Sequence, residues 1–407
     1  MKALGTSDIR NDFPILQRKL GGKPLVYLDN ASTSQKPKQV LDAMDEFYRN
    51  SNANVMRSTN SLGLEATEIY HGARNRVAEM IGASPKEVIF TRGTTEGLNV
   101  LARILTKKYV CSGGKVITSI LEHHSNILPW RNSVSVVGAK LAVLPANRSW
   151  TMDLDRLEAE LSDGADIVTT LHVSNVLGTI NPVKEICRLA HDHGALVVLD
   201  SAQGVPHMPV DVKEIDVDFM VFSSHKMLGP TGVGVLYGKQ SHLEDLEPWE
   251  LGGGMVKSVT ADEVSYEDLP TRLEAGTPNI AGVIGLAAAV NYLQDIGMQS
   301  IVDHERRLLR HAFEVLPKEI LELYGPTEAY SHSGMLAFNV KGIHPHDVAS
   351  ALDKEGIIVR AGHHCAQPLV NALGTTATVR ASFYLYNSHE EVDLLGQGLR
   401  RSVEILT

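Results

Sequence analysis

A lysine and a cysteine, far apart in the chain, are the residues best placed for covalent chemistry. Lys226 follows the apolar run 219–222 and precedes Gly229 and Pro230. Burial disfavours the ammonium form of such a lysine, and the neutral amine is the form that attacks a carbonyl carbon. Cys365 lies beside two histidines in a glycine-containing loop, where we expect an exposed thiol with a pKa below the ~8.5 of a free thiol. A surface lysine on a loop is the alternative interpretation of Lys226.

Two polar residues after a neighbouring apolar run suggest what the lysine attacks. Asp200 ends the run that starts at Leu196, and Gln203 follows three residues later. Beside a Schiff-base lysine, an aspartate can pair with the ring nitrogen of pyridoxal phosphate (PLP), which keeps that nitrogen protonated and makes the ring an electron sink. Gln203 could then reach the phenolic oxygen of the ring. A helix cap is the other common use of an aspartate in this position.

A hydroxyl-rich segment containing Thr94 and Thr95 links another apolar run to a helix that we expect to begin near Leu98. Hydroxyls and free backbone N–H groups at a helix N-terminus form a cradle for phosphate. Ser223 and His225 could add hydrogen bonds to the same phosphate. A simple threonine N-cap is the alternative for this segment.

Adjacent histidines, His123 and His124, follow a third apolar run. One imidazole could lie flat on an aromatic cofactor ring and also carry protons. Adjacent residues cannot share a helical face, so a zinc site here would need ligands from elsewhere. Cys365 and its neighbouring histidines also lack zinc-finger spacing, and we predict no metal site. Asn175, after a fourth run, could donate a hydrogen bond to cofactor or substrate.

An arginine inside a strand pattern, Arg380, is a candidate for binding a substrate carboxylate. Its guanidinium group presents a planar fork of N–H donors that matches the two oxygens of a carboxylate. An ion pair with an acidic side chain of the protein is the alternative, and the sequence alone favours it.

Apolar runs that alternate with helical patterns must position these residues. Such runs are typical of strands covered on both faces, since neither face carries water-seeking side chains. Strand–helix alternation predicts a mainly parallel sheet with helices on both sides, and ligands bind beyond the carboxyl ends of such strands. The expected strands are 88–90, 116–118, 167–171, 196–199 and 219–222.

The pattern becomes more mixed after about Asn279, which predicts a second, smaller α/β domain. A long helical stretch from 283 towards 316 opens it, and Ser388 with Glu391 can close a capping box at the start of its last helix. We place a large domain at 25–280 and a small domain, which carries the cysteine loop, at 1–24 and 281–407. The expected strands of the small domain are 335–340, 357–359 and 378–383.

The composition fits a folded protein that acts on small molecules. The 407 residues include 38 lysines and arginines against 48 aspartates and glutamates, a net charge of −10 that is opposite in sign to that of a nucleic-acid binder. No apolar run is long enough to cross a bilayer, and the N-terminus does not resemble a signal peptide. Cys111, Cys187 and Cys365 are too scattered for a disulfide framework, so we expect a cytoplasmic protein.

Segments along nearly the whole chain resemble the fold-type I PLP enzymes and, more narrowly, the SUF-type (group II) cysteine desulfurases, a group that includes selenocysteine lyases. The lysine segment alone is typical of the whole class V aminotransferase superfamily, whereas Arg-Ala-Gly-His-His-Cys-Ala at 360–366 is far more specific. The resemblance implies an α/β fold with a mainly parallel seven-stranded sheet flanked by helices and a smaller C-terminal α/β domain. The other matching segments are 28–32, 92–97, 122–124, 172–178, 200–203, 223–232 and 274–279.

The resemblance also implies a role for each candidate residue. Lys226 would form the covalent link to PLP, His123 would stack on the ring, and Cys365 would accept sulfur. Thr277 would reach the phosphate from a second subunit, because the family is homodimeric with sites at the interface. The substrate carboxylate would be bound by Asn175, Arg360 and Arg380. The remaining cofactor-binding residues would be Thr94, Thr95, Asp200, Gln203, Ser223 and His225.

The activity that the resemblance implies is the conversion of L-cysteine to L-alanine, with the sulfur held on Cys365 as a persulfide for a sulfur-acceptor protein of iron–sulfur cluster assembly. A selenocysteine lyase acting on L-selenocysteine, and a class V aminotransferase or β-lyase that does not use Cys365, stay open as alternatives. The non-enzymatic alternative is an assembly or metal-binding scaffold. At Met56 the family pattern leads us to expect a histidine, and methionine cannot transfer protons.

Overall fold

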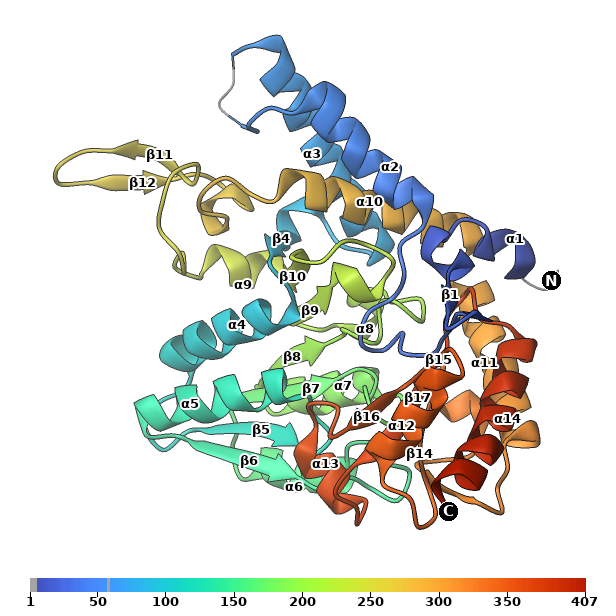
Figure 1. The fold of residues 1–407 in the computed structure, drawn as a ribbon. Coiled ribbons are helices and arrows are strands. Elements are labelled where there is room, and N and C mark those ends of the chain that lie inside the picture. The colour runs from blue at the N-terminus through green and yellow to red at the C-terminus, as the bar shows by residue number, and fades with distance from the viewer. Residues whose placement is uncertain (1–5, 57–58) are drawn as a thin grey trace.

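A seven-stranded sheet forms the centre of the molecule (Figure 1). The computed structural model describes residues 6–56 and 59–407. Across the sheet the strands are β4 (Val88–Thr91), β10 (Gly234–Gly238), β9 (Phe219–Ser223), β8 (Leu196–Asp200), β7 (Ile167–Leu171), β5 (Lys115–Ser119) and β6 (Lys140–Leu144). All neighbours from β9 to β6 are parallel, and only β10 runs antiparallel to both of its partners. The predicted mainly parallel sheet is confirmed.

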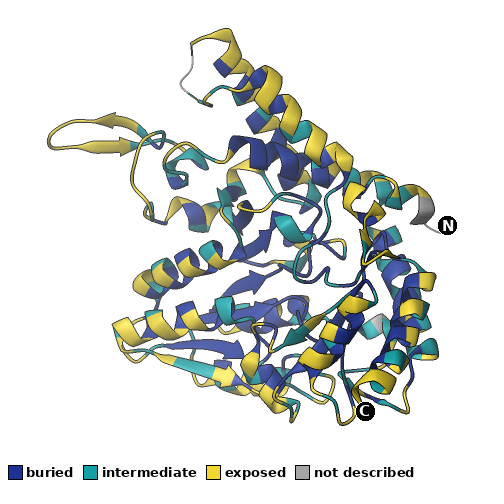
Figure 2. Cartoon of the chain, viewed as in Figure 1, coloured by how far each residue is buried: buried dark blue, intermediate teal, exposed yellow. Residues whose placement is uncertain are grey.

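Consecutive side chains of the central strands point to opposite faces of the sheet and so belong to different hydrophobic cores. In β5, Val116 packs against the helices on one face and Ile117 against those on the other. In β8, Val198 and Val197 are divided between the two faces in the same way. Because helices cover both faces, the central strands are apolar and buried (Figure 2). One face carries α4 (Thr94–Tyr109) and α5 (Leu128–Val137); the other carries α3 (Ser61–Met80), α6 (Leu154–Ser162), α7 (Val183–Asp192) and α10 (Ile280–Ile296).

A four-stranded antiparallel sheet with a hydrophobic core of its own lies beside the central sheet. Its strands, in order, are β13 (Leu321–Tyr324), β14 (Met335–Val340), β17 (Thr378–Ser382) and β16 (Arg360–Gly362). Its helices are α11 (Met298–Val315), α12 (Pro345–Lys354), α13 (Gln367–Ala372) and α14 (His389–Leu406). The predicted capping box at the start of α14 is confirmed, since Ser388 Oγ accepts from the Glu391 N–H and the Glu391 carboxylate accepts from the Ser388 N–H.

The N-terminal segment joins this smaller part of the molecule. Strand β3 (Val26–Tyr27) pairs in parallel with β15 (Ile357–Ile358), and Arg10, the last residue of α1 (Thr6–Arg10), forms an ion pair with Glu391 in α14. The domain boundaries at 25–280 and at 1–24 with 281–407 stay a prediction. The shorter elements elsewhere are β1 (Lys19–Leu20), β2 (Lys23–Pro24), α2 (Lys38–Glu46), α8 (Val212–Ile215) and α9 (Gln240–Glu244).

The structure differs from expectation in two segments. Helix α4 begins at Thr94 and not near Leu98. The helix expected to run from 283 towards 316 breaks at Gly297, whose φ of +87° suits glycine, so that α10 and α11 are bent by 74°. Among the described residues no single helix is long and apolar enough to cross a membrane, and α10 and α11 meet that test only as this bent pair.

A projecting hairpin occupies much of the glycine-rich stretch 251–269. It consists of β11 (Val256–Val259) and β12 (Val264–Tyr266), which pair antiparallel. The hairpin stands away from the central sheet and from the other described elements (Figure 1). Most of its residues are exposed, which explains why the sequence lacks the apolar alternation of a strand packed on a core.

A buried ion pair ties α3 to the segment that precedes α10. Two guanidinium nitrogens of Arg74 each donate to a different oxygen of Glu274 at 2.7 Å, and one of them also donates to the carbonyl of Val88. Glu274 also accepts the backbone N–H of Phe90, and the rings of Tyr70 and Phe90 flank the guanidinium group. Only 2% of the Arg74 side chain is exposed, so each charge depends on the other for its partner.

Replacing Arg74 with methionine is expected to lower the free energy of unfolding by about 3–5 kcal/mol, because Glu274 would keep a buried charge without a counter-ion. Arg76→Met is the matched control on the same helix, since Arg76 and its partner Glu79 are exposed. We expect little change in the control. Urea denaturation of the wild type and of the two variants measures the free energy of unfolding of each. Equal losses of this free energy in Arg74→Met and Arg76→Met would contradict this account of the ion pair.

Candidate active site

A cavity of about 240 Å³ lies where the carboxyl ends of β7, β8 and β9 face β16 and β17 of the smaller sheet. Of the thirteen predicted site residues, twelve line this cavity and one does not. The residues that the structure brings together are Thr94, Thr95, His123, Asn175, Asp200, Gln203, Ser223, His225, Lys226, Arg360, Cys365 and Arg380. The exception is Thr277.

The amine of Lys226 enters the cavity just beyond the end of β9. Desolvation lowers its pKa, and the carboxylate of Asp200 only partly offsets this effect. Lys226 therefore gives up its proton more easily than an exposed lysine does.

Asp200 ends β8 with only 5% of its surface exposed. Burial raises its pKa, although the Ala202 N–H at 3.0 Å and the charge of Lys226 act in the opposite direction. A cationic ligand group beside Asp200 would supply the counter-charge that a buried carboxylate needs.

His123 is a neutral imidazole on the loop that follows β5. Burial, aided by the charge of Lys226, lowers the pKa of His123 to about 3. Its Nδ1 accepts the backbone N–H of Ser125 at 3.1 Å, so the proton of the neutral ring is on Nε2. The ring can therefore contact an aromatic ligand without bringing a charge to it.

The first turn of α4 forms a cradle of hydrogen-bonding groups with the end of β9. The Thr94 N–H donates to Ser223 Oγ at 2.8 Å, and the two hydroxyl oxygens are 2.7 Å apart. The hydroxyls of Thr95 and Ser125 are 2.9 Å apart at the same cavity. Gly93 precedes α4 with a φ of +154°, a backbone conformation that residues with a side chain rarely adopt. The cradle has the donors and the free space that a phosphate group needs.

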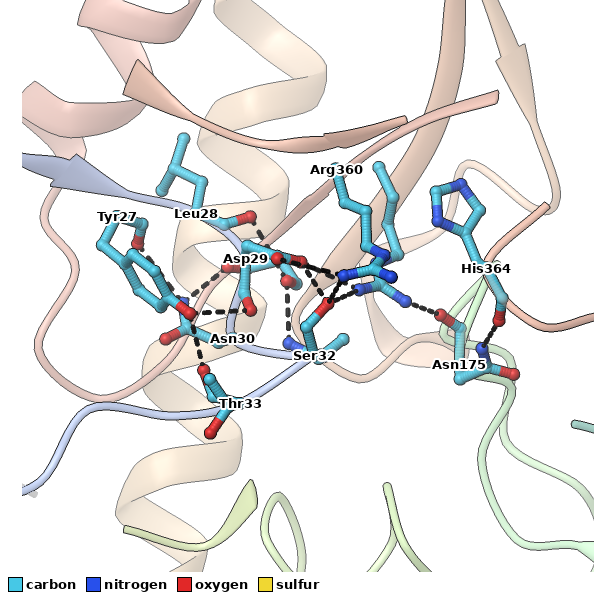
Figure 3. Close-up of polar contacts among 12 residues, drawn as sticks. Tyr27, Leu28, Asp29, Asn30, Ser32, Thr33, Asn175, Arg360 and His364 are labelled. Carbon is cyan, nitrogen blue, oxygen red and sulfur yellow. Dashed lines mark hydrogen bonds and ion pairs between the residues drawn. The ribbon is translucent and has the colours of Figure 1, made fainter. Parts of the chain in front are cut away.

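Arg380 lines the same cavity and is fixed by a network of oxygen atoms from Asp29, Ser32 and Asn175, three residues labelled in Figure 3. One terminal nitrogen donates to the carbonyl of Asn175 at 2.6 Å, and the other donates to Asp29 Oδ1 at 3.0 Å and to Ser32 Oγ at 2.8 Å. Arg360 approaches the second oxygen of Asp29 at 4.0 Å. The ion pair that the sequence favoured is therefore present, and it faces a cavity.

Sequence reasoning did not single out Asp29 and Ser32 as members of this network. The available signal was their position in the segment 28–32, which matches the family pattern and follows the short strand β3. A substrate carboxylate can use donors of Arg380 that Asp29 leaves free, because the buried Nε–H of Arg380 makes no hydrogen bond to any described residue.

Cys365 lies on an exposed turn at the mouth of the same cavity. Cys187, by contrast, is 1% exposed in α7, and burial raises the pKa of its thiol to about 12, which agrees with a packing role. Within residues 6–56 and 59–407, no group of three or more His, Cys, Asp or Glu side chains is arranged to hold a metal ion.

Thr277 borders a different cavity, of about 260 Å³, together with Met56 and Gly254. A single chain therefore does not bring Thr277 to the phosphate cradle. Its role as a residue supplied by a second subunit stays a prediction. Arg57, which completes the motif around Met56, lies outside the described residues.

Known proteins resemble this chain over almost its whole length. The pattern of the family Aminotransferase class-V matches residues 26–395. A protein of Halalkalibacterium halodurans described as a probable cysteine desulfurase is 48% identical over 403 residues, which cover 98% of each chain. The cysteine desulfurase of Haloferax volcanii is 43% identical and matches 98% of this chain and 96% of its own. The apo cysteine desulfurase of Thermococcus onnurineus has a TM-score of 0.94 and 41% identity, with 99% of both chains covered.

The fold and the cavity thus define a PLP-dependent enzyme of the class V aminotransferase superfamily. Within that superfamily, the chain belongs to the cysteine desulfurase family. The resemblance of the motifs to this family is confirmed.

The cavity fits PLP group by group. Asp200 offers a buried carboxylate for the ring nitrogen, the cradle at Thr94 and Ser223 suits the phosphate, and Lys226 offers an amine for the aldehyde. Gln203 donates from Nε2 to the carbonyl of Ala31 at 2.7 Å, while its buried Oε1 makes no hydrogen bond to any described residue. This unfilled polar position is expected where a bound group completes the hydrogen bonding.

Proposed function

We propose that the protein is a PLP-dependent cysteine desulfurase, which converts L-cysteine to L-alanine and takes the sulfur onto Cys365 as a persulfide. The observation that carries this proposal is that the amine of Lys226 and the thiol of Cys365 line one cavity together with the guanidinium group of Arg380. The cavity therefore has separate groups for Cα, for the sulfur and for the carboxylate of one amino acid. The names of the relatives support the same activity.

The residues around Cα bind the amino acid and remove its proton. PLP, when bound, accepts the electron pair that the departing proton leaves on Cα. Lys226 removes that proton with its neutral Nζ, a form that burial makes more accessible by lowering the pKa. Arg380 binds the carboxylate and so orients Cα towards Lys226.

Cys365 takes the sulfur in a displacement that balances within the enzyme. Its thiolate attacks the substrate sulfur, an S–S bond forms, and the Cβ–S bond breaks with its electron pair passing to Cβ. Cβ takes up a proton and becomes the methyl group of alanine. The protonated amine of Lys226, which holds the proton taken from Cα, can supply this proton, whereas the neutral ring of His123 keeps its Nε2 proton. The substrate carbon is reduced and the enzyme sulfur is oxidised, so no outside oxidant is needed.

The test is to incubate the purified holoenzyme with L-cysteine. We expect L-alanine in solution and, without reductant, a Cys365 peptide that is heavier by one sulfur atom in mass spectrometry. Release of a keto acid would instead support a β-lyase or an aminotransferase. Turnover of L-selenocysteine by the wild-type holoenzyme without turnover of L-cysteine would support a selenocysteine lyase. Bound metal without a PLP spectrum would support the scaffold.

We also propose that the enzyme works as a homodimer with its active sites beside the subunit interface. A hollow of about 1390 Å³ runs along α4 and α5 up to the phosphate cradle. Leu128 and Val136 line this hollow with 57% and 78% of their surfaces exposed, which suits a covering by a second copy. Thr277 of that copy would then complete the cradle. A solution mass equal to that of one chain would contradict the dimer.

The physiological sulfur acceptor, we propose, is a protein of iron–sulfur cluster assembly in the cytoplasm. Cys365 is exposed, so a thiol of another protein can reach a persulfide held there. The test is to load the enzyme with labelled sulfur and to follow the label after adding such a protein. Release of the label to small thiols alone would contradict this proposal.

A further inference from the structure

The turn that carries Cys365 has an unfavourable backbone conformation. His364 and Cys365 both lie in the left-handed region, with φ of +52° and +56°. Residues with a Cβ rarely adopt this region, and two in succession persist only where the surroundings hold them. The turn therefore needs contacts that outweigh the strain.

Two of these contacts hold the backbone carbonyls of the turn. The side-chain amide of Asn175 donates to the carbonyl of His364 at 2.7 Å (Figure 3), and the backbone N–H of His124 donates to the carbonyl of Cys365 at 2.6 Å. Both donors belong to loops that follow strands of the central sheet. The backbone of the turn is thus anchored to the large sheet.

A third contact comes from the imidazole of His364, which is 6% exposed. Its Nε2 lies 3.1 Å from the carbonyl oxygen and 2.9 Å from the hydroxyl of Thr378. A carbonyl oxygen only accepts, so Nε2 must carry the proton and donate it to Thr378. Burial lowers the pKa of His364 to about 3, in agreement with a neutral ring. This contact anchors the turn to β17 of the smaller sheet.

Thr378 and Arg380 stand two residues apart in β17 and so face the same side of the strand. Asn175 contacts both Arg380 and the Cys365 turn. Its side-chain amide donates to the backbone carbonyl of His364, and its backbone carbonyl accepts from the guanidinium group of Arg380 at 2.6 Å. Two links therefore join β17 to the Cys365 turn. In one, the ring of His364 binds Thr378, and in the other, Asn175 binds both the guanidinium group of Arg380 and the backbone carbonyl of His364.

We propose that His364 is a positioning residue, which fixes the Cys365 thiol at the distance from Arg380 that the sulfur of a bound L-cysteine requires. This inference rests on the proposed function, in which Arg380 binds the carboxylate and Cys365 attacks the sulfur. Loss of the Nε2 donor lets the turn leave its strained conformation while Lys226 and the cofactor groups keep their places. The step that suffers is sulfur transfer, and removal of the Cα proton continues.

The test compares two amides of different length with a neighbouring control. In His364→Gln the amide nitrogen can reach the position of the imidazole Nε2, whereas in His364→Asn it falls one methylene short. We expect persulfide formation in the holoenzyme to slow on the order of 10- to 100-fold in H364N with little change in KM, and to be largely restored in H364Q. His363→Asn changes an exposed histidine and is expected to behave like the wild type.

Two further measurements separate positioning from a general structural role. Deuterium exchange at Cα of L-alanine in D₂O reports on Lys226 without any sulfur chemistry, and it should match the wild type in all variants. Alkylation of Cys365 by iodoacetamide in the cofactor-free chain should become severalfold faster in H364N alone, because the turn is looser.

The inference would be overturned if H364N formed the persulfide at the rate of the wild type. It would also be overturned if H364N and H364Q lost the same share of that rate. So would a loss of Cα exchange parallel to the loss of persulfide. Failure of the wild-type enzyme itself to form a persulfide would refute the proposed function instead, and the two failures are therefore distinguishable.

Discussion

Replacing Lys226 with alanine is expected to abolish the formation of L-alanine from L-cysteine, with a loss of at least about 10³-fold in rate. The variant loses both the base that takes the Cα proton and the amine that links the cofactor to the protein. The desolvated position of Lys226 lowers its pKa and is the physical reason why it can serve as that base. Chromatographic measurement of alanine and the visible spectrum of the purified variant report the two losses separately.

A second lysine whose pKa is lowered by desolvation provides the matched control for this change. Burial lowers the pKa of Lys36 to about 8, yet its Nζ donates to the carbonyl of His225 at 2.9 Å and does not line the cavity. Lys36→Met should therefore keep the absorbance of the covalently attached cofactor. Alanine formation by Lys226→Ala at a rate near that of the wild type would show that another group is the base.

The position of the site could be predicted because a parallel sheet brings its functional residues to one edge. Asp200 and Ser223 follow or end apolar runs that the sequence marks clearly, and parallel neighbours place both at the same side. The short segment from Ser223 to Lys226 leaves the lysine no room to lie elsewhere. The proximity of Asp200, Ser223 and Lys226 thus follows from the apolar runs that mark the strands, and from the rule that ligand sites lie beyond the carboxyl ends of parallel strands.

Strands with weaker patterns escaped prediction for identifiable reasons. β6 lies at the edge of the sheet, and four of its five residues are partly or fully exposed, so it lacks a continuous apolar run. β13 is likewise an edge strand, with only Leu321 buried. The break at Gly297 was missed because the helical pattern continues on both sides of it, and periodicity alone carries no information on the 74° bend.

Contacts between distant segments could not be derived from the sequence at all. Nothing in the spacing of Asp29 and Arg380 shows that they meet, because the contact depends on how β3 and β17 are placed by the smaller sheet. The left-handed backbone at His364 and Cys365 could not be predicted either. In a sequence a positive φ is expected at glycine, and neither residue is a glycine. Tertiary contacts, which local patterns do not encode, impose both features.

Replacing Cys365 with serine is expected to leave PLP attached while lowering alanine formation from L-cysteine by about 10²-fold or more. Serine keeps the size of the side chain, but its hydroxyl cannot supply the thiolate that attacks the substrate sulfur. Deuterium exchange at Cα should continue, because Lys226 and Arg380 are unchanged. The visible spectrum, the alanine assay and mass spectrometry of the Cys365 peptide measure these three expectations.

The comparison of cysteine variants separates the candidate activities most sharply. Cys111→Ser changes another exposed thiol, outside the cavity, and should retain full activity. If Cys365→Ser forms alanine from L-cysteine as fast as the wild type does, the sulfur leaves without thiolate attack and Cys365 is not the acceptor. If it fails with L-cysteine but still releases selenium from L-selenocysteine, the thiolate is needed only for the poorer leaving group, because selenium departs from carbon more readily than sulfur. That pattern would place the role of Cys365 at the breaking of the Cβ–S bond and leave the chemistry at Cα to Lys226.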